Sequence, residues 1–185
     1  QNPGDCLFEA LCHQLKYTKT ADTKPRELRQ NLVAYIKQNT QLENGDHVMT
    51  LFDTTTNDEW RVNSKQNEKK SADEMKLSYY TDSYMNKPET TGDTLMIWAC
   101  SQLYDVDFEI FPSASDRSYK ISAKDDDSIR ATVRLGFVGQ AYFVSLVSTN
   151  KESTEFMYLL GRKIKACDQV TEIKKQAGLM SDLGL

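Results

Sequence analysis

The sequence predicts one α/β (α+β) domain in which a small mixed β-sheet packs between helices. Apolar residues recur at helical spacing up to about residue 104, and segments of alternating apolar residues follow. A length of 185 residues with 39% hydrophobic content supports one substantial core and is short for two. No internal repeat interrupts this pattern.

The charge balance argues against a nucleic-acid surface. Lysine and arginine number 23 against 27 acidic residues, which gives a net charge of −4, and the basic residues are scattered along the chain. No apolar run approaches the roughly 20 residues that cross a bilayer. We therefore expect a protein partner, with neither nucleic acid nor membrane involved.

The cysteines and histidines argue against a metal site. Cysteines stand at positions 6, 12, 100 and 167 without a C-x-x-C pair, and the chain has only two histidines. We expect no metal and no cofactor. Reduced thiols fit an intracellular compartment, the cytoplasm or the nucleus. Because the chain begins at Gln1 and not at a methionine, we expect a piece of a longer protein.

The first expected helix begins near Cys6. Gly4 permits a tight turn, and Asp5 is a residue type that commonly caps helix N-termini. The apolar stripe of this helix recurs every four residues, at Leu7, Leu11 and Leu15. At a helix start the backbone amides and the macrodipole stabilise a thiolate, so Cys6 is a candidate nucleophile. The alternative is a small apolar residue packed under the helix.

Three further helical segments follow. Thr23 before Pro25 predicts a cap and a first-turn proline, with a helix running to about residue 39. Ser71 and Glu74 have the spacing of a capping box for one or two helical turns. Residues 92 and 93 should cap the most buried helix, which ends near residue 104. Residues 54–70 are polar and predict a loop.

The strands lie in the second part of the chain. Alternation predicts a strand over 105–111, a short edge strand over 119–121, and a hairpin of 130–137 with 141–147. Residues 150–185 carry apolar residues at near-helical spacing, which predicts a helical C-terminal extension. The sequence leaves open whether this extension forms one helix or two, and whether it packs on the domain or binds a partner.

Two blocks of the sequence resemble the OTU (ovarian tumour) family of cysteine deubiquitinases. Residues 4–11, Gly-Asp-Cys-Leu-Phe-Glu-Ala-Leu, resemble the family's nucleophile segment, commonly D-G-N-C-L-F-R-A. Residues 83–111 resemble its middle block, in which a W-G-(G/D) turn leads into a helix and then a strand. The resemblance spans residues 3–148.

The resemblance implies a papain-type cysteine protease fold over residues 1–149, and the predicted helical extension at 150–185 lies beyond it. It also implies a thiol isopeptidase that removes ubiquitin, with ubiquitin or a ubiquitin-like protein as partner. Cys6 would stand at the nucleophile position, with Gly4 and Asp5 in the loop that shapes the oxyanion region.

The family's catalytic histidine has no counterpart here. The family carries an H-Y-x pattern on a late hairpin strand, with Asn or Asp two residues after the His. Aligning H-Y on Ala141 and Tyr142 keeps the tyrosine and puts Phe143 at the orienting position. Aligning on Ser145 instead puts Tyr142 at the base position. We prefer the first register, although neither supplies an imidazole.

Other residues do not replace that base. A thiol protease needs a base within hydrogen-bond reach of its sulfur. His13 lies seven residues after Cys6, about 10 Å along the same helix. His47 belongs to a segment that the family does not use for catalysis, and we expect it to be structural or exposed. Pro3 is a further departure, because the family usually has an acidic residue there.

Three functions follow for the chain. The first is a pseudoenzyme that keeps Cys6 and binds ubiquitin, a ubiquitin-like protein or another protein through the old substrate surface. The second is an active cysteine deubiquitinase whose base was replaced by Ala141 or is unconventional. The third is an α/β interaction domain in which the resemblance is fortuitous. The departures at Pro3 and Phe143 favour the first.

Overall fold

The computed structural model describes residues 3–52, 70–115, 117–124, 128–139, 142–148 and 156–159. Its α-helices are α1 (Cys6–Tyr17), α2 (Pro25–Gln38), α4 (Ala72–Tyr79) and α5 (Thr94–Tyr104). Short helical turns are η1 (Pro3–Asp5), η2 (Val48–Leu51) and η3 (Tyr80–Tyr84), the last a π-helical turn that continues α4. The strands are β1 (Val106–Pro112), β2 (Tyr119–Ile121), β3 (Ala131–Val138), β4 (Tyr142–Ser148) and β5 (Phe156–Leu159).

The strands form one mixed sheet in the order β2-β1-β3-β4-β5. β1 and β3 are parallel and aligned from Val106 opposite Ala131 to Pro112 opposite Phe137. The other neighbours are antiparallel, so β3 and β4 form the expected hairpin and β2 is the expected edge strand. The predicted mixed sheet is confirmed.

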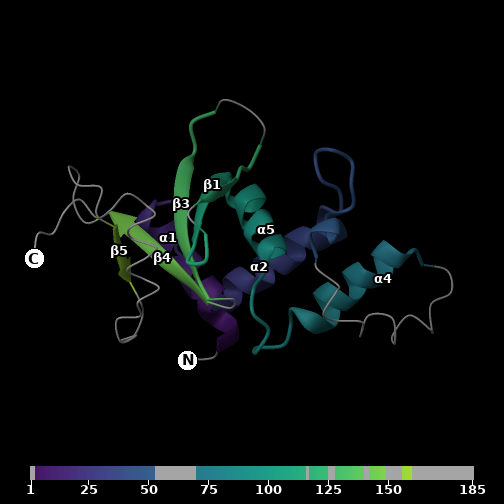
Figure 1. Ribbon diagram of the computed structural model, residues 1–185. Coiled ribbons are helices and arrows are strands. Elements are labelled where there is room, and N and C mark those ends of the chain that lie inside the picture. The colour runs from purple at the N-terminus through teal and green to yellow at the C-terminus, as the bar shows by residue number, and fades with distance from the viewer. Residues whose placement is uncertain are drawn as a thin grey trace, which may run out of the picture.

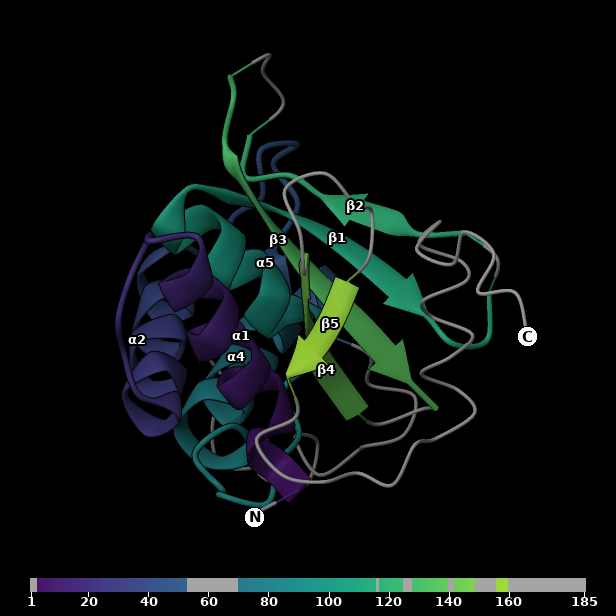
Figure 2. The same ribbon diagram turned by 90° about the vertical axis from the view of Figure 1, so that its left-hand side faces the viewer.

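The described helices lie in layers on one face of this sheet (Figure 2). α1 packs along β4 and β3, and α5 packs on β1 and β2. α2 contacts both α1 and α5, and forms the layer beyond them, while α4 lies at the far end of the molecule from β4 (Figure 1). The sheet and the first two helices therefore bring the two ends of the OTU-like sequence together.

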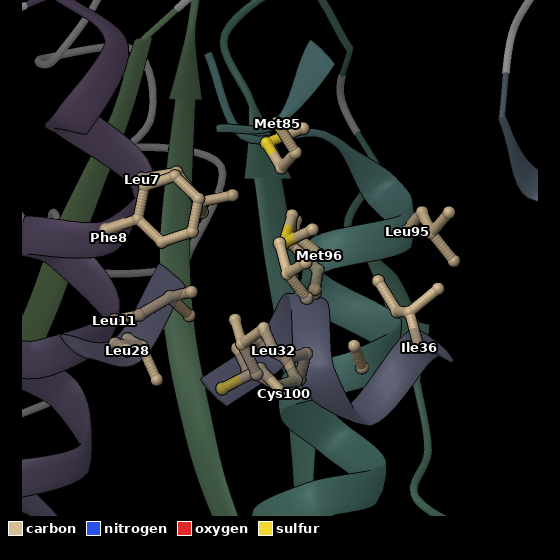
Figure 3. Close-up of a cluster of buried hydrophobic side chains, with 14 of the residues drawn as sticks. Leu7, Phe8, Leu11, Leu28, Leu32, Ile36, Met85, Leu95, Met96 and Cys100 are labelled. Atoms are coloured by element: carbon tan, nitrogen blue, oxygen red, sulfur yellow. The ribbon is translucent and has the colours of Figure 1, made fainter. Parts of the chain in front are cut away.

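The core fills the space between α1, α2, α5 and the sheet (Figure 3). Its fully buried side chains come from helices and from strands β1 and β3. Those from the three helices include Leu7, Phe8, Leu11, Leu28, Leu32, Ile36, Leu95, Met96 and Cys100. The predicted apolar stripe of the first helix is therefore confirmed, because all three of its leucines are fully buried. Burying each such side chain stabilises the fold by about 1.5–3 kcal/mol.

Two of the predicted helix starts are confirmed in detail. Ser71 Oγ accepts from the Glu74 amide and the Glu74 carboxylate accepts from the Ser71 amide, which completes the capping box. At α5 the side chain of Asp93 accepts a hydrogen bond from the Met96 amide. These sequences satisfy amides that the first helical turn leaves without partners.

The other two cap predictions are wrong. The side chain of Asp5 does not cap α1, because η1 runs directly into the helix and the Asp5 carboxylate pairs with Arg29. Thr23 does not cap α2 either. Lys24 occupies the N-cap position in an extended conformation, and Pro25 begins the helix as predicted. A first-turn proline has no amide to satisfy, which reduces the need for a side-chain cap.

The C-terminal extension differs from its helical prediction over four residues. Phe156–Leu159 form strand β5, which pairs with β4 from Ser145 opposite Leu159 to Ser148 opposite Phe156. Pairing satisfies the backbone of β4 on the side away from β3, and this gain outweighs the helical spacing of the side chains. The rest of the extension and the predicted loop at 54–69 lie outside the described residues. Within the described part, no helix is long and apolar enough to cross a membrane.

Candidate active site

Cys6 is the first residue of α1 and lies against the start of β4. The backbone amides of Phe143 and, at the helix start, of Leu7 lie close enough to its sulfur to stabilise the charged form. The Cys6 residue is half-buried. The predicted position of this thiol at a helix N-terminus is therefore confirmed, and the strand of the late hairpin faces it.

Among the described residues, β5 pairs with only part of β4. β4 pairs with β3 from Val138 opposite Tyr142, whereas β5 covers β4 only from Ser145 onward. Tyr142 and Phe143 thus lie beyond the end of β5.

Burial raises the pKa of the Cys6 thiol above its ordinary value. The amide hydrogen bonds from Phe143 and Leu7 lower that pKa, and the nearby carboxylate of Glu9 raises it. Loss of hydration outweighs the helix terminus because a half-buried sulfur loses water that would stabilise its charged form. The stabilisation of a thiolate expected at a helix start is therefore present but is outweighed by burial.

The side chains at the start of β4 are aromatic. Phe143 packs on Phe137 of β3, with ring centroids 4.7 Å apart, at the edge of the core. Tyr142 is 52% exposed. Successive side chains of a strand point to opposite faces, so Phe143 shares the α1-facing side of β4 with Ser145 and Tyr142 points to the other side. Ala141 lies outside the described residues.

Both imidazoles of the chain are engaged elsewhere. His13 Nδ1 lies 2.8 Å from the Ser145 hydroxyl oxygen, two turns along α1 from Cys6. His47 precedes η2, and its Nδ1 accepts a hydrogen bond of 3.2 Å from the Met49 amide. The expected structural role of His47 is confirmed by this cap.

Arg29 of α2 organises the loop before Cys6. Its side chain is nearly enclosed, since the residue is only 6% exposed. Nη2 donates to the Gly4 carbonyl oxygen at 2.8 Å and to Asp5 Oδ1 at 2.9 Å. Nη1 donates to the carbonyl oxygens of Met85 at 3.2 Å and Thr90 at 3.0 Å. One guanidinium therefore joins the nucleophile loop to the loop after η3.

Two glycines allow these loops to touch. A Cβ atom on Gly4 would lie 2.3 Å from the Pro88 carbonyl oxygen and 2.5 Å from the Glu89 carbonyl carbon. A Cβ atom on Gly92 would lie 2.4 Å from Leu7 Cδ2. Gly4 is therefore required for a close backbone approach, in addition to the turn that its position predicted.

Of the two contact residues that the sequence analysis missed, Gln14 and Arg29, the first has a recognisable signal in the sequence. Gln14 follows Leu11 by three residues and so belongs to the buried face of α1. Its side chain donates to Ser145 Oγ and the Leu146 carbonyl and accepts from the Arg134 amide. Arg29 directly follows the buried Leu28, yet periodicity alone does not identify the carbonyl groups that it meets.

The described residues contain no group of three or more His, Cys, Asp or Glu side chains placed to hold a metal ion.

Comparison with known proteins places the fold. A family model for OTU-like cysteine proteases matches residues 1–144. A structure of an ovarian tumour (OTU) domain in complex with ubiquitin is 16% identical and has a TM-score of 0.52, with 94% of this chain and 79% of that chain covered. The OTU domain of OTUD1 is 12% identical, with a TM-score of 0.51 and coverage of 78% and 80%.

A further similar structure is an OTU deubiquitinase from Wolbachia pipientis wMel. It is 14% identical, covers 93% of this chain and 91% of that chain, and has a TM-score of 0.49. A search among curated proteins gave no match. The two OTU-domain structures with TM-scores above 0.5 show a shared fold alone, and function has to follow from the residues at the site.

Proposed function

Because a family model matches residues 1–144, this chain belongs to the OTU-like cysteine proteases, and we propose that it is a catalytically impaired member. It binds ubiquitin or a ubiquitin-like protein through the Cys6 face, which we define as Asp5, Cys6 and Phe143. An OTU domain of this fold has been crystallised with ubiquitin, which supports that class of partner over an unrelated protein. The OTU-like domain spans residues 1–149 in an intracellular protein, and 150–185 form an extension.

The observation that carries the proposal is the engagement of both imidazoles away from Cys6. His13 is hydrogen-bonded to Ser145, and His47 caps η2. A thiol hydrolase needs a base that accepts the thiol proton and later protonates the leaving amine. With both imidazoles of the chain committed elsewhere, neither of them serves Cys6 as that base. Loss of one partner from such a catalytic unit typically lowers kcat by several orders of magnitude.

The start of β4 supports the same function. A phenylalanine at position 143 cannot orient a base by hydrogen bonding, and its ring packs on Phe137. The side chain of Tyr142 points away from the α1 side of the strand, which supports Ala141 over Tyr142 as the position of the family's histidine. The raised pKa of Cys6 also fits a thiol that is not maintained as a nucleophile.

An active enzyme is the second candidate, and one observation favours it. The sulfur still faces the Phe143 amide and the first amides of α1, so the geometry that would stabilise a thiolate is retained. On this alternative Ala141 replaces the original base, or an unconventional base acts. The two candidates differ in what restoring a histidine achieves.

The deciding experiment is labelling of Cys6 by ubiquitin that carries a C-terminal electrophile. The native chain is compared with Ala141→His, Tyr142→His and the control Cys6→Ala, and ubiquitin binding is titrated in parallel. The proposal expects binding to the native chain, with slow labelling that neither histidine increases more than about tenfold. Labelling that rises about a thousandfold or more in Ala141→His, with cleavage of a ubiquitin conjugate, would establish the active enzyme. Absence of both binding and labelling would exclude ubiquitin as the partner.

A further inference from the structure

Arg29 makes more contacts with the segments around Cys6 than a simple ion pair requires. Each terminal nitrogen serves a different segment, because Nη2 binds the nucleophile loop and Nη1 binds the loop after η3. Its Cζ atom also lies 4.1 Å from the centroid of the Phe8 ring, in the first turns of α1. The guanidinium is held on three sides and is nearly inaccessible.

We propose that Arg29 is a positioning residue that fixes the Gly4–Asp5 peptide, and with it the backbone amides beside Cys6, for an oxygen that carries negative charge. This inference rests on the proposed role of the Cys6 face. It assigns Arg29 no contact with a bound ligand. The ligand group that these amides would stabilise is a carbonyl group whose oxygen becomes negatively charged, such as the carbonyl at the C-terminus of a protein tail.

The planarity of the peptide bond explains how Arg29 acts at a distance. In a trans peptide, the carbonyl oxygen of one residue and the amide hydrogen of the next point in opposite directions. The chain has no cis peptide bond among its described residues. When Nη2 holds the Gly4 carbonyl at 2.8 Å, the Asp5 amide therefore points away from Arg29, and rotation of this peptide is prevented.

The contacts require an arginine. A guanidinium presents its donors in a planar fork, so its two terminal nitrogens can reach separate segments at once. A lysine ammonium has three donors on a single atom and cannot span both loops. Lysine at position 29 would keep the charge but leave one loop without its hydrogen bonds.

A merely structural role predicts a different result. If Arg29 only stabilised the fold, its replacement would lower the unfolding temperature and leave the chemistry of Cys6 unchanged in the folded protein. The proposal instead requires a change in those reactions of Cys6 that place charge on a carbonyl oxygen. Reactions that involve no such oxygen provide an internal reference.

The experiment compares two reactions of Cys6 in the full chain. With p-nitrophenyl acetate, the sulfur bonds to the carbonyl carbon and the electron pair of the C=O bond moves to oxygen. That electron pair then re-forms the C=O bond as p-nitrophenolate leaves with the electrons of its C–O bond. With iodoacetamide, the sulfur displaces iodide from a saturated carbon and no oxyanion forms. The ratio of the two rates cancels the thiolate fraction and the exposure of the sulfur, and peptide-resolved mass spectrometry restricts both rates to Cys6.

Arg29→Lys and the neutral Arg29→Gln are measured below their unfolding midpoints, with Ser101→Ala as the matched structural control. Ser101 is fully buried and donates to the Val106 carbonyl, far along the chain from the nucleophile loop. We expect the acylation-to-alkylation ratio to fall about tenfold in both Arg29 variants, since loss of a whole oxyanion donor costs about 100-fold to 1,000-fold. Ser101→Ala should lose stability and keep its ratio.

An unchanged ratio in a folded Arg29 variant, together with a lowered unfolding temperature, would overturn the proposal. If one Arg29 variant does not fold, the other is used. Faster amide hydrogen exchange over residues 4–8 in a folded Arg29 variant than in Ser101→Ala would support the proposal. The small ester needs no ubiquitin. An unchanged acylation-to-alkylation ratio in the Arg29 variants is therefore distinguishable from a failure of the Cys6 face to bind ubiquitin.

Discussion

Tyr80 and Asp93 are joined by a hydrogen bond of 2.8 Å, in which the tyrosine hydroxyl donates to Asp93 Oδ1. The same oxygen accepts from the Met96 amide and so caps α5. Burial raises the pKa of Asp93 to about 6 and the pKa of Tyr80 well above its usual value. The cap of the most buried helix therefore titrates between acid and neutral pH.

This pKa predicts a loss of stability with rising pH. The folded protein holds the Asp93 proton up to about pH 6, whereas the unfolded chain releases it near 3.8. The contribution of Asp93 is present below pH 3.8 and declines as pH rises toward 6, with a slope of at most about 1.4 kcal/mol per pH unit. The slope should fall short of that limit because part of the residue remains solvent-accessible.

Urea unfolding of the native chain and Asp93→Asn between pH 4 and 7 checks this. The asparagine oxygen can still accept both hydrogen bonds, so the variant should fold and lose this part of the pH dependence. Asp82→Asn, at an exposed carboxylate with a lowered pKa, is the control. Parallel curves for the native chain and Asp93→Asn would contradict the prediction.

Gly4→Ala should destabilise the nucleophile loop. The new Cβ would overlap backbone atoms of Pro88 and Glu89, which cannot rotate away as a flexible side chain can. We expect a loss of about 1–3 kcal/mol or more in the free energy of unfolding, measured by thermal or urea denaturation. Gly45→Ala is the comparison, because Gly45 has φ +85° with open space around it and should lose only about 1 kcal/mol.

Gln14→Met should be one of the more costly changes in α1. It keeps the volume of the side chain but leaves the Leu146 carbonyl and the Arg134 amide without their buried partner. Each unsatisfied group costs about 1–3 kcal/mol. Ser145→Ala removes only one hydroxyl and should cost less. An equal loss for both variants would show that the backbone contacts of Gln14 contribute nothing.

Glu9→Gln should make Cys6 more reactive. Its carboxylate raises the pKa of Cys6, and the two residues are three apart on α1, within one turn. Like charges at this spacing disfavour each other by about 0.2–0.5 kcal/mol, so alkylation of Cys6 by iodoacetamide near neutral pH should quicken about twofold. Glu43→Gln, beyond α2, should leave the rate unchanged.

The sequence predicted the elements better than the contacts between them. The leucine spacing of α1, the capping box at Ser71 and the alternation of β1 each depend on neighbours within a few residues. Strand β5 has no such local signal. Its residues recur at helical spacing in the sequence, and pairing with the edge of β4, the strand that precedes it, overrides that spacing.

The site, too, was predicted better in its local structure than in its contacts between elements. The place of Cys6 at a helix start followed from local spacing, but the pKa of its thiol depends on burial by segments that the sequence does not order in space. Asp5 illustrates this limit. As a residue type it favours capping, yet a buried arginine from another helix takes its carboxylate. The need of a buried charged side chain for an ion-pair partner therefore outweighs the capping preference of that partner within its own segment.

The packing of α1 on β4 has a consequence for synthesis. Gln14 and Ser145 are hydrogen-bonded across 131 positions of the sequence. At roughly 5–20 residues per second, the ribosome makes α1 roughly 7 to 26 seconds before the strand that covers it. Throughout that interval the leucine face of α1 has no sheet to bury it, so the nascent chain should need a chaperone until the hairpin has emerged.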